Sequence, residues 1–186
     1  MKQKLIQLIA EKSFNYSKTP TFKLASGKMS QYYVNCKPTV LDPYGMNLVG
    51  HLVFEKLDTQ SVSAVGGLTF GADPIAVSTS FVSGLKNQPV KSFSVRKLQK
   101  DHGMIRWIEG DIQEGEKVAI LEDVVTTGGS TIKAIQRVRS EGLDVLQVIV
   151  LVDRQEGGID EIIKYVDRVD TIVTLNDLMT YIQIEN

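Results

Sequence analysis

The segment Val118–Ser130, VAILEDVVTTGGS, constrains the fold of this chain more than any other. It begins with an apolar run, continues with adjacent carboxylates at Glu122 and Asp123, and ends with hydroxyls and two glycines ahead of a helical pattern. A buried strand that turns through glycine into a helix brings backbone N–H groups together, and the helix N-terminus adds partial positive charge. The pattern therefore predicts a phosphate site at Thr126–Ser130, beside two acids.

The two acids indicate what else lies at this site. Because like charges repel, Glu122 and Asp123 must face neutral hydroxyls or a divalent metal rather than the phosphate. Phosphate, sugar hydroxyls and metal together describe a phosphorylated ribose. The alternative, a strand-turn-helix unit without a ligand, stays open because many α/β domains contain apolar runs that end in Asp.

Length, charge and cysteine content limit the class of protein. A chain of 186 residues fits a single domain, 1–186, with a sizeable core. Its 21 basic and 22 acidic residues nearly cancel, which argues against a protein-wide nucleic-acid surface but not against a local basic patch. The single cysteine, Cys36, excludes an internal disulfide, suits a reducing compartment, and fits a small half-buried strand residue better than a nucleophile. With no targeting segment and no membrane-length apolar run, we expect a cytoplasmic protein without nucleic-acid or membrane partners.

Apolar patterns along the chain alternate between strands and helices, which predicts βαβ units and a mostly parallel sheet flanked by helices. The expected helices run from Leu5 to about Phe14, from Asp42-Pro43, from Asp73-Pro74, from Ile132 to Gly142, over Ile159–Ile163 and over Asn176–Ile184. The expected sheet strands are Val62–Val65, which Gly66-Gly67 ends, Val90–Val95, Val118–Leu121, Val145–Val152 and Thr171–Thr174. Two further strand-like pieces surround a Ser26-Gly27 turn, and Glu109–Glu116 is expected to be a turn region.

Candidate ligand-binding residues follow four successive strands of this predicted sheet. They are Gly66-Gly67, Arg96, Glu122-Asp123 and Asp153-Arg154. Ligands of open α/β sheets bind beyond the carboxyl ends of the strands, at the point where the topology switches. Because a random scatter would not follow strand ends, this arrangement supports a site independently of the central segment.

The segment Arg96–Gly103, RKLQKDHG, concentrates positive charge through Arg96, Lys97, Lys100 and His102. The ordinary interpretation of such a run is a solvated charged turn. Cations with little apolar content would also suit the binding of a pyrophosphate when a lid closes over it.

The central segment resembles the 5-phosphoribosyl-1-pyrophosphate (PRPP) motif of the type I phosphoribosyltransferases, and its combination with the basic segment resembles the orotate phosphoribosyltransferase family. In that family an RK-x-x-K-x-HG segment forms a mobile catalytic loop that reaches across a homodimer into the neighbouring site. Arg96, Lys97, Lys100 and His102 match it position by position.

Two more segments carry the same resemblance. Phe22–Tyr33 is similar to the family's N-terminal stretch, whose paired aromatics, here Tyr32 and Tyr33, lie beside the base. At least one of the two is open to the alternative of packing in the core or at a subunit contact, because alternate strand residues face opposite ways. Asp153–Glu156, DRQE, is similar to the family tetrad whose arginine binds the orotate carboxylate, with a salt bridge from Arg154 to Glu156 or Asp153 as the alternative.

The resemblance implies an α/β protein with the type I phosphoribosyltransferase fold, a small N-terminal hood formed by residues up to about 40, and a mobile loop. It implies Mg²⁺-dependent transfer of phosphoribose from PRPP to orotate by a homodimer. The catalytic residues that it implies are Arg96, Lys100, His102 and Asp123. The PRPP-binding residues are Arg96, Lys97, Lys100, His102, Glu122, Asp123, Val124, Val125, Thr126, Thr127, Gly128, Gly129 and Ser130. The orotate-binding residues are Thr126, Arg154, Tyr32 and Tyr33, and Mg²⁺ is held mainly by substrate, with Glu122 and Asp123 as candidate ligands.

The sequence also departs from the family pattern. Many members have Lys where Ala25 stands, some have Lys near Gly71, and Lys28 is a candidate replacement. A purine or uracil phosphoribosyltransferase and a PRPP-sensing or nucleotide-sensing regulator are the rival functions. A nucleotide triphosphatase is disfavoured because Ala72-Asp73 stands where a P-loop requires Lys-Ser/Thr.

Overall fold

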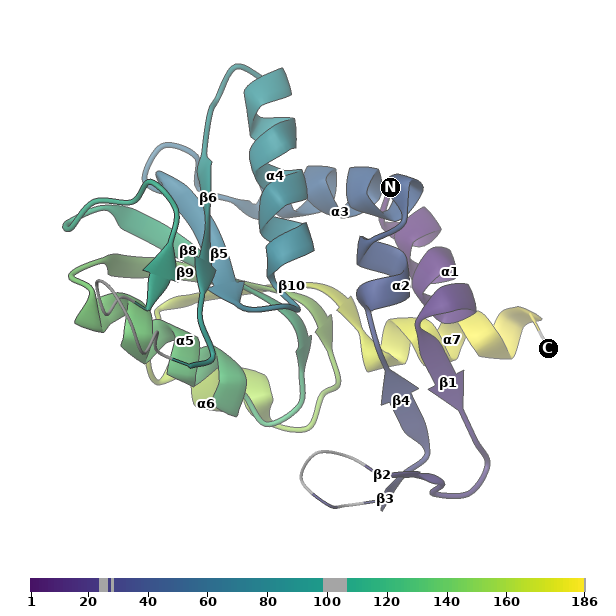
Figure 1. The fold of residues 1–186 in the computed structure, drawn as a ribbon. Coiled ribbons are helices and arrows are strands. Elements are labelled where there is room, and N and C mark those ends of the chain that lie inside the picture. The colour runs from purple at the N-terminus through teal and green to yellow at the C-terminus, as the bar shows by residue number, and fades with distance from the viewer. Residues whose placement is uncertain (24–26, 28, 99–106, 186) are drawn as a thin grey trace.

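The computed structural model of the protein describes residues 1–23, 27, 29–98 and 107–185 (Figure 1). The helices are α1 (Lys2–Lys12), α2 (Lys37–Val40), α3 (Pro43–Lys56), α4 (Asp73–Leu85), α5 (Gly129–Ser140), α6 (Gly158–Ile163) and α7 (Leu175–Glu185). The strands are β1 (Phe14–Tyr16), β2 (Phe22–Lys23), β3 (Met29–Ser30), β4 (Tyr32–Val34), β5 (Ala64–Leu68), β6 (Lys91–Val95), β7 (Ile108–Glu109), β8 (Lys117–Val125), β9 (Asp144–Asp153) and β10 (Arg168–Thr174).

The central sheet has the strand order β10-β9-β8-β5-β6-β7. All neighbouring strands are parallel except β7, which pairs antiparallel with β6. This confirms the predicted mostly parallel sheet. Strands β9, β8, β5 and β6 are direct neighbours and parallel, so their carboxyl ends lie along one edge.

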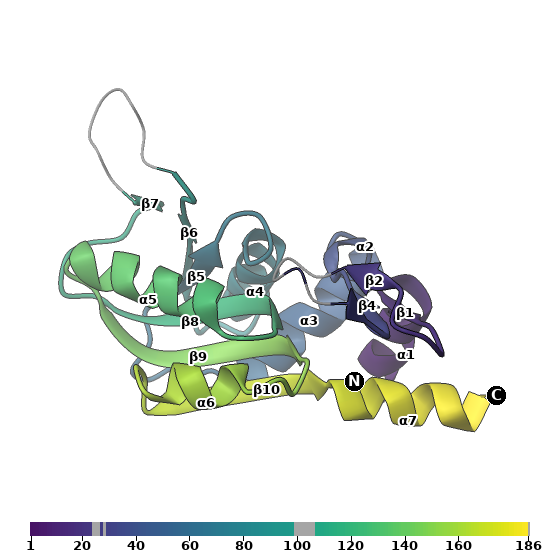
Figure 2. The same ribbon diagram turned by 90° about the horizontal axis from the view of Figure 1, so that it is seen from below.

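Helices cover both faces of the sheet, and β8 shows why. Its successive side chains enter different cores, because alternate strand residues point to opposite faces. Leu121 packs with residues of α1, α3, α4 and α7, whereas Ile120 packs with residues of α5 and α6. Figures 1 and 2 show these two groups of helices on either side of the sheet. Among the described helices, none has the length and apolar character needed to cross a bilayer.

The N-terminal elements project beside the carboxyl edge of the sheet (Figure 1). Strand β1 pairs antiparallel with β4, and β2 pairs antiparallel with β3. Helix α1 ends at Lys12, two residues earlier than predicted, because the chain enters β1 at Phe14. Cys36 was predicted to be a half-buried strand residue, but it is fully buried and is the N-cap of α2.

Two sequence predictions about β5 and β8 were wrong in a way that matters for the site. Gly66 and Gly67 do not end β5 but lie within it. A Cβ at Gly66 would stand 2.3 Å from the Phe93 carbonyl oxygen, and a Cβ at Gly67 would stand 2.1 Å from the Leu121 carbonyl oxygen, so neither position has room for a side chain. The glycines thus permit close packing of the strands. Strand β8 continues to Val125, so the acidic pair lies inside the strand rather than after it.

Helix starts were predicted with mixed success. The Asp42 carboxylate does cap α3, accepting hydrogen bonds from the N–H groups of Tyr44 and Gly45. Asp73 does not cap α4; it is the first helical residue and accepts a hydrogen bond from the Ser94 hydroxyl. The short strand β7 lies at the start of the region predicted to be a turn.

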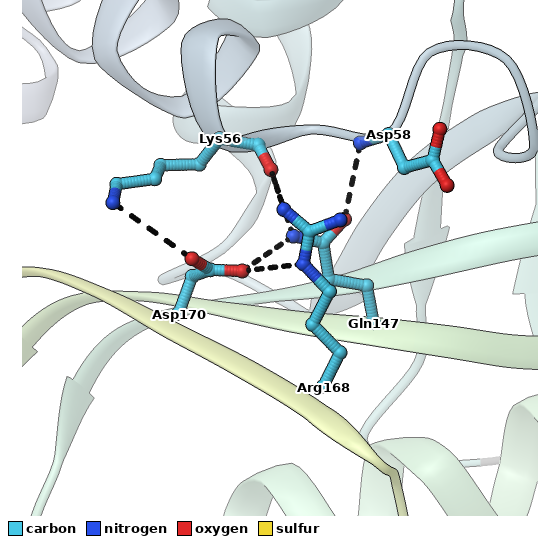
Figure 3. A network of polar contacts seen from close by, with 5 residues as sticks. All are labelled: Lys56, Asp58, Gln147, Arg168 and Asp170. Carbon is cyan, nitrogen blue, oxygen red and sulfur yellow. Dashed lines mark hydrogen bonds and ion pairs between the residues drawn. The ribbon is translucent and has the colours of Figure 1, made fainter.

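A polar network fixes the end of α3 to β9 and β10, at the edge of the sheet away from the acidic pair (Figure 3). The fully buried Gln147 amide donates to the Lys56 carbonyl at 2.9 Å and to the Asp170 carboxylate at 2.7 Å, and it accepts from the Asp58 N–H at 3.3 Å. Arg168 donates to the same Lys56 carbonyl and to Asp170. Because every polar atom of Gln147 has a partner, its burial carries no unpaired group.

Candidate active site

A first cavity of about 320 Å³ opens at the carboxyl ends of β8 and β9. Its walls come from the N-terminal strands, the turn between β8 and α5, and the end of β9. The lining residues are Lys23, Tyr33, Val34, Glu122, Val124, Val125, Thr126, Thr127, Gly128, Gly129, Ser130, Thr131 and Arg154. Every residue of the predicted phosphate site therefore lines one cavity.

A second cavity of about 190 Å³ adjoins the first at the end of β5. The two cavities share Glu122, Val124 and Ser130. The second is lined by Lys37, Leu68, Thr69, Phe70, Gly71, Lys97, Glu122, Asp123, Val124 and Ser130. The acidic pair thus stands where the two cavities meet.

The turn between β8 and α5 is built to expose helix N–H groups. Gly128 adopts φ +80°, a conformation that favours glycine, and a Cβ there would stand 2.7 Å from the Gly158 carbonyl oxygen. Because Gly128 is the N-cap and has no side chain, it leaves the first N–H groups of α5 uncapped. No acidic residue occupies the first turn of α5. The first cavity therefore ends in an anion-binding surface of hydroxyls and free N–H groups.

The two acids have different environments. Glu122 is only 6% exposed and accepts a hydrogen bond of 2.9 Å from the Thr131 hydroxyl. Burial, and then the neighbouring charge of Asp123, raise the pKa of Glu122 to about 8. Asp123 is half-buried, and its carboxylate lies so close to Gly71 that a Cβ on Gly71 would be 2.6 Å from Oδ1. Asp123 is therefore the acid turned toward the second cavity.

Arg154 follows β9 and is 5% exposed in the wall of the first cavity. Its Nη2 forms an ion pair with Glu156 at 2.7 Å and donates to the Ser30 hydroxyl at 3.1 Å. The alternative salt bridge to Glu156 thus exists, but Nε is buried and has no hydrogen-bond partner among the described residues. An unmet buried donor costs about 1–3 kcal/mol, so this atom favours an incoming acceptor.

The structure separates the two candidate tyrosines. Tyr33 lines the first cavity, and its ring stacks on Phe22 with centroids 6.0 Å apart. Tyr32 instead packs between Phe14 and Tyr16, at 6.2 and 5.7 Å, and is absent from the described lining of both cavities. The alternation of strand residues accounts for this difference.

Only part of the basic segment can be located. Lys97 lines the second cavity, whereas the Arg96 Nε donates to Glu109 at 2.7 Å. Lys100 and His102 lie outside the described residues, as do Ala25 and Lys28. Among the described cations of this segment, Lys97 is thus the predicted one that lines a cavity of the candidate site.

Sequence reasoning missed two lysines at the cavities, Lys23 in the first and Lys37 in the second. Neither stands in a pattern that predicts binding. Thr69 and Phe70 were also missed, although a signal existed: they follow β5 at the same sheet edge as the acids.

The carboxylates present fit a magnesium ion that is held mostly by substrate. Within the described part of the chain, no group of three or more His, Cys, Asp or Glu side chains is arranged to hold a metal. Mg²⁺ commonly binds through one or two carboxylates together with substrate phosphates and waters. Asp123, which faces the second cavity, suits that role better than the buried Glu122.

The phosphoribosyl transferase domain family matches residues 77–180, which contain the turn, the acids and Arg154. Fold and site therefore define the class of protein as a phosphoribosyltransferase. The chain is 48% identical over 163 residues to the orotate phosphoribosyltransferase of Aquifex aeolicus, a match that covers 88% of this chain and 89% of the relative. On this similarity the chain belongs to the orotate phosphoribosyltransferase family.

Solved structures agree with this assignment. Orotate phosphoribosyltransferase of Mycobacterium tuberculosis in complex with Fe(III) dicitrate has a TM-score of 0.82 at 34% identity, covering 95% of this chain and 98% of the other. The same enzyme in complex with PRPP has a TM-score of 0.77 at 31% identity, again covering 95% and 98%.

Proposed function

We propose that this enzyme transfers the 5-phosphoribosyl group of PRPP to orotate, giving orotidine 5′-monophosphate and pyrophosphate in pyrimidine synthesis. The observation that carries the proposal is the pair of joined cavities around Glu122 and Asp123, one ending in an uncapped helix and the other flanked by lysines. Their polarity matches a sugar that carries a phosphate at one end and a diphosphate at the other.

The 5′-phosphate is assigned to Thr126–Ser130, where hydroxyls and helix N–H groups converge. The ribose then lies over Glu122 and Asp123, whose carboxylates accept from its 2′- and 3′-hydroxyls. Positive charge develops on the ribose as the anomeric bond breaks, and the nearby carboxylate of Asp123 favours it.

The diphosphate is assigned to the second cavity. Its negative charge grows as it leaves, and Lys97 and Lys37 are the described cations that line this space. Thr69–Gly71 offer their main chain to the same anion. We further assign Lys100 and His102, which lie outside the described residues, to this step, and Arg96 to the same basic segment.

Orotate is assigned to the first cavity, between Tyr33 and Arg154. The free Nε of Arg154 supplies a charged donor for the orotate carboxylate, and Thr126 lies in the same wall. Tyr32, packed against Phe14 and Tyr16, acts by supporting β4 and not by contact.

Mg²⁺, when bound, neutralises part of the diphosphate charge and helps to orient it. Asp123 is the candidate protein ligand, because its carboxylate faces the second cavity. Glu122, with a pKa of about 8, is better suited to hydrogen bonding.

We propose that residues 1–186 act as a single domain in which the elements up to about residue 40 form a hood over the first cavity, since Lys23, Tyr33 and Val34 line it. We also propose a homodimer. Helix α4 exposes Val77, Phe81 and Leu85 by 54%, 68% and 65%, at a spacing that places them along one helix face. Such a stripe favours contact with a second copy. A cytoplasmic location without nucleic-acid partners fits the balanced charge and the lone buried thiol.

The decisive experiment follows the loss of orotate absorbance after PRPP and Mg²⁺ are added to the purified protein. We expect turnover with orotate and none when PRPP is omitted. Uracil, adenine and hypoxanthine serve as control bases. Preference for one of them would assign a different phosphoribosyltransferase, and PRPP binding without pyrophosphate release would favour a regulator.

A further inference from the structure

One arginine of α5 contacts both the first two residues of the basic segment and the tryptophan that precedes β7. The Arg137 guanidinium donates through Nη1 to the Arg96 carbonyl at 2.6 Å and through Nη2 to the Lys97 carbonyl at 3.1 Å. The same group lies over the Trp107 ring, 4.0 Å from its centroid. Arg96 and Lys97 directly follow β6, and Trp107 directly precedes β7, so a single side chain contacts the chain just after one strand and just before the next.

Two further contacts reinforce this arrangement. The Arg96 N–H donates to the Trp107 carbonyl at 2.8 Å, which continues the pairing of β6 with β7. The Trp107 N–H donates to the Glu141 carboxylate at 2.9 Å. Glu141 follows α5 directly, one turn beyond Arg137. The end of the helix therefore holds the chain after β6 through Arg137 and the chain before β7 through Arg137 and Glu141. In Figure 2, β6 and β7 rise above α5.

Helix α5 thereby joins two anion-binding regions. Its first residues, Gly129 and Ser130, line the first cavity, and Arg137 lies about two turns further along the same helix. Lys97, whose carbonyl Arg137 holds, lines the second cavity. A helix is stiff over this length, so the position of the Lys97 main chain is fixed relative to the 5′-phosphate site.

The chemistry of the contact favours arginine specifically. The planar guanidinium offers several donors in a rigid fork and also stacks on an aromatic face. It serves two adjacent carbonyls and one indole at once. A lysine at this position would keep the charge but would lose the fork.

We propose that Arg137 is a positioning residue for phosphoribosyl transfer: it holds the main chain of Arg96 and Lys97 so that the Lys97 ammonium faces the diphosphate, without itself contacting substrate. This inference rests on the proposed function, since it assigns the second cavity to the diphosphate. Arg137 matches none of the motif positions through which the family resemblance was established.

The test compares Arg137→Met and Arg137→Lys with Arg139→Met. Arg139 is a matched control, because it stands on the same helix and also donates to a main-chain carbonyl, that of Tyr165, at 2.8 Å. We expect Arg137→Met to lower kcat about tenfold or more, with the KM for orotate unchanged, because the orotate region lies at the other end of the helix. Arg137→Lys is expected to be intermediate, and Arg139→Met to match the wild type.

Trp107 provides a second readout, because it is the only tryptophan of the chain. Titration with inorganic pyrophosphate is expected to change its emission in the wild type and in Arg139→Met, and to bind more weakly in Arg137→Met and Arg137→Lys. This measurement does not require turnover. An inactive wild type would therefore overturn the proposed function, while the titration still tests Arg137.

Two results would overturn the inference: a folded Arg137→Met or Arg137→Lys variant with wild-type kcat and pyrophosphate affinity, or equal losses for orotate and pyrophosphate that track a lowered Tm. The lysine variant keeps the test decisive if the methionine variant does not fold.

Discussion

Thr131 and Glu122 are joined by a hydrogen bond of 2.9 Å from the threonine hydroxyl to the glutamate Oε2, in the wall of the first cavity, which both residues line. The bond attaches the first turn of α5 to β8. Because both side chains are buried, the protonation state of Glu122 affects the stability of the fold as well as the chemistry of the site.

Stability is expected to depend on pH through Glu122. Its pKa is raised from 4.5 to about 8, chiefly by burial. As the pH rises, Glu122 ionises at a lower pH in the unfolded chain than in the folded one. The stabilising contribution of the protonated carboxyl group is therefore complete below pH 4.5 and is lost as the pH rises toward 8. Relative to Glu122→Gln, the wild-type free energy of unfolding should fall by roughly 4 kcal/mol over that range. Urea denaturation of both proteins at several pH values measures this, and a pH-independent difference would contradict it.

Gly71→Ala is expected to impair turnover by displacing Asp123. The added Cβ would stand 2.6 Å from the Asp123 Oδ1, so the carboxylate must move. We expect kcat/KM for PRPP to fall about tenfold to a hundredfold while Tm changes little. The control is Gly84→Ala, because a Cβ there meets nothing within 4 Å in the described structure. Equal kinetics for the two variants would show that Asp123 tolerates the displacement.

Lys37→Ala is expected to raise the KM for PRPP about tenfold and to leave the KM for orotate unchanged, because Lys37 lines only the second cavity. Steady-state kinetics with each substrate varied in turn measures the split. Lys164→Ala, which removes an exposed lysine from the end of α6, is the control. A rise in the KM for orotate instead would show that Lys37 acts on orotate and not on the diphosphate of PRPP.

Lys100→Ala is expected to lower kcat by about a hundredfold or more with folding intact, as the loss of a cation that stabilises a leaving diphosphate should. Single-turnover kinetics and circular dichroism separate the chemical step from the fold. Wild-type turnover in this variant would remove the basic segment from the mechanism.

Phe81→Glu is expected to convert a dimer into a monomer, because it places a charge in the exposed apolar stripe of α4. Light scattering over a range of protein concentrations measures the change. Gln136→Glu adds the same charge at an exposed position of α5 and should leave the assembly intact. An unaltered mass for Phe81→Glu would move the interface elsewhere.

The sequence predicted the parts of this structure that depend on local patterns. The alternation of apolar runs gave the parallel sheet, the Asp42-Pro43 pair gave the start of α3, and the glycines after Asp123 gave the turn into α5. Both Tyr32 and Tyr33 were predicted to bind orotate, and the alternation of strand residues was the reason to leave open that at least one of them packs elsewhere, as Tyr32 does.

The remaining parts depend on partners that are distant along the chain. In the sequence, Gly66 and Gly67 indicate the end of a strand. The structure shows that they lie against the main chain of Phe93 and Leu121, which are distant along the chain. Lys37 enters the second cavity through the placement of α2 and not through a motif. Arg137 meets carbonyls about forty residues away, a contact that helical periodicity on α5 does not encode.

The two glycines of β5 also limit how this protein can change. At these positions the neighbouring strands lie against bare main chain, so almost any replacement would force the sheet apart. Selection for a new acceptor base, in the laboratory or in nature, is therefore expected to change residues that line the first cavity, such as Tyr33 and Arg154, and to leave these two glycines of β5 in place.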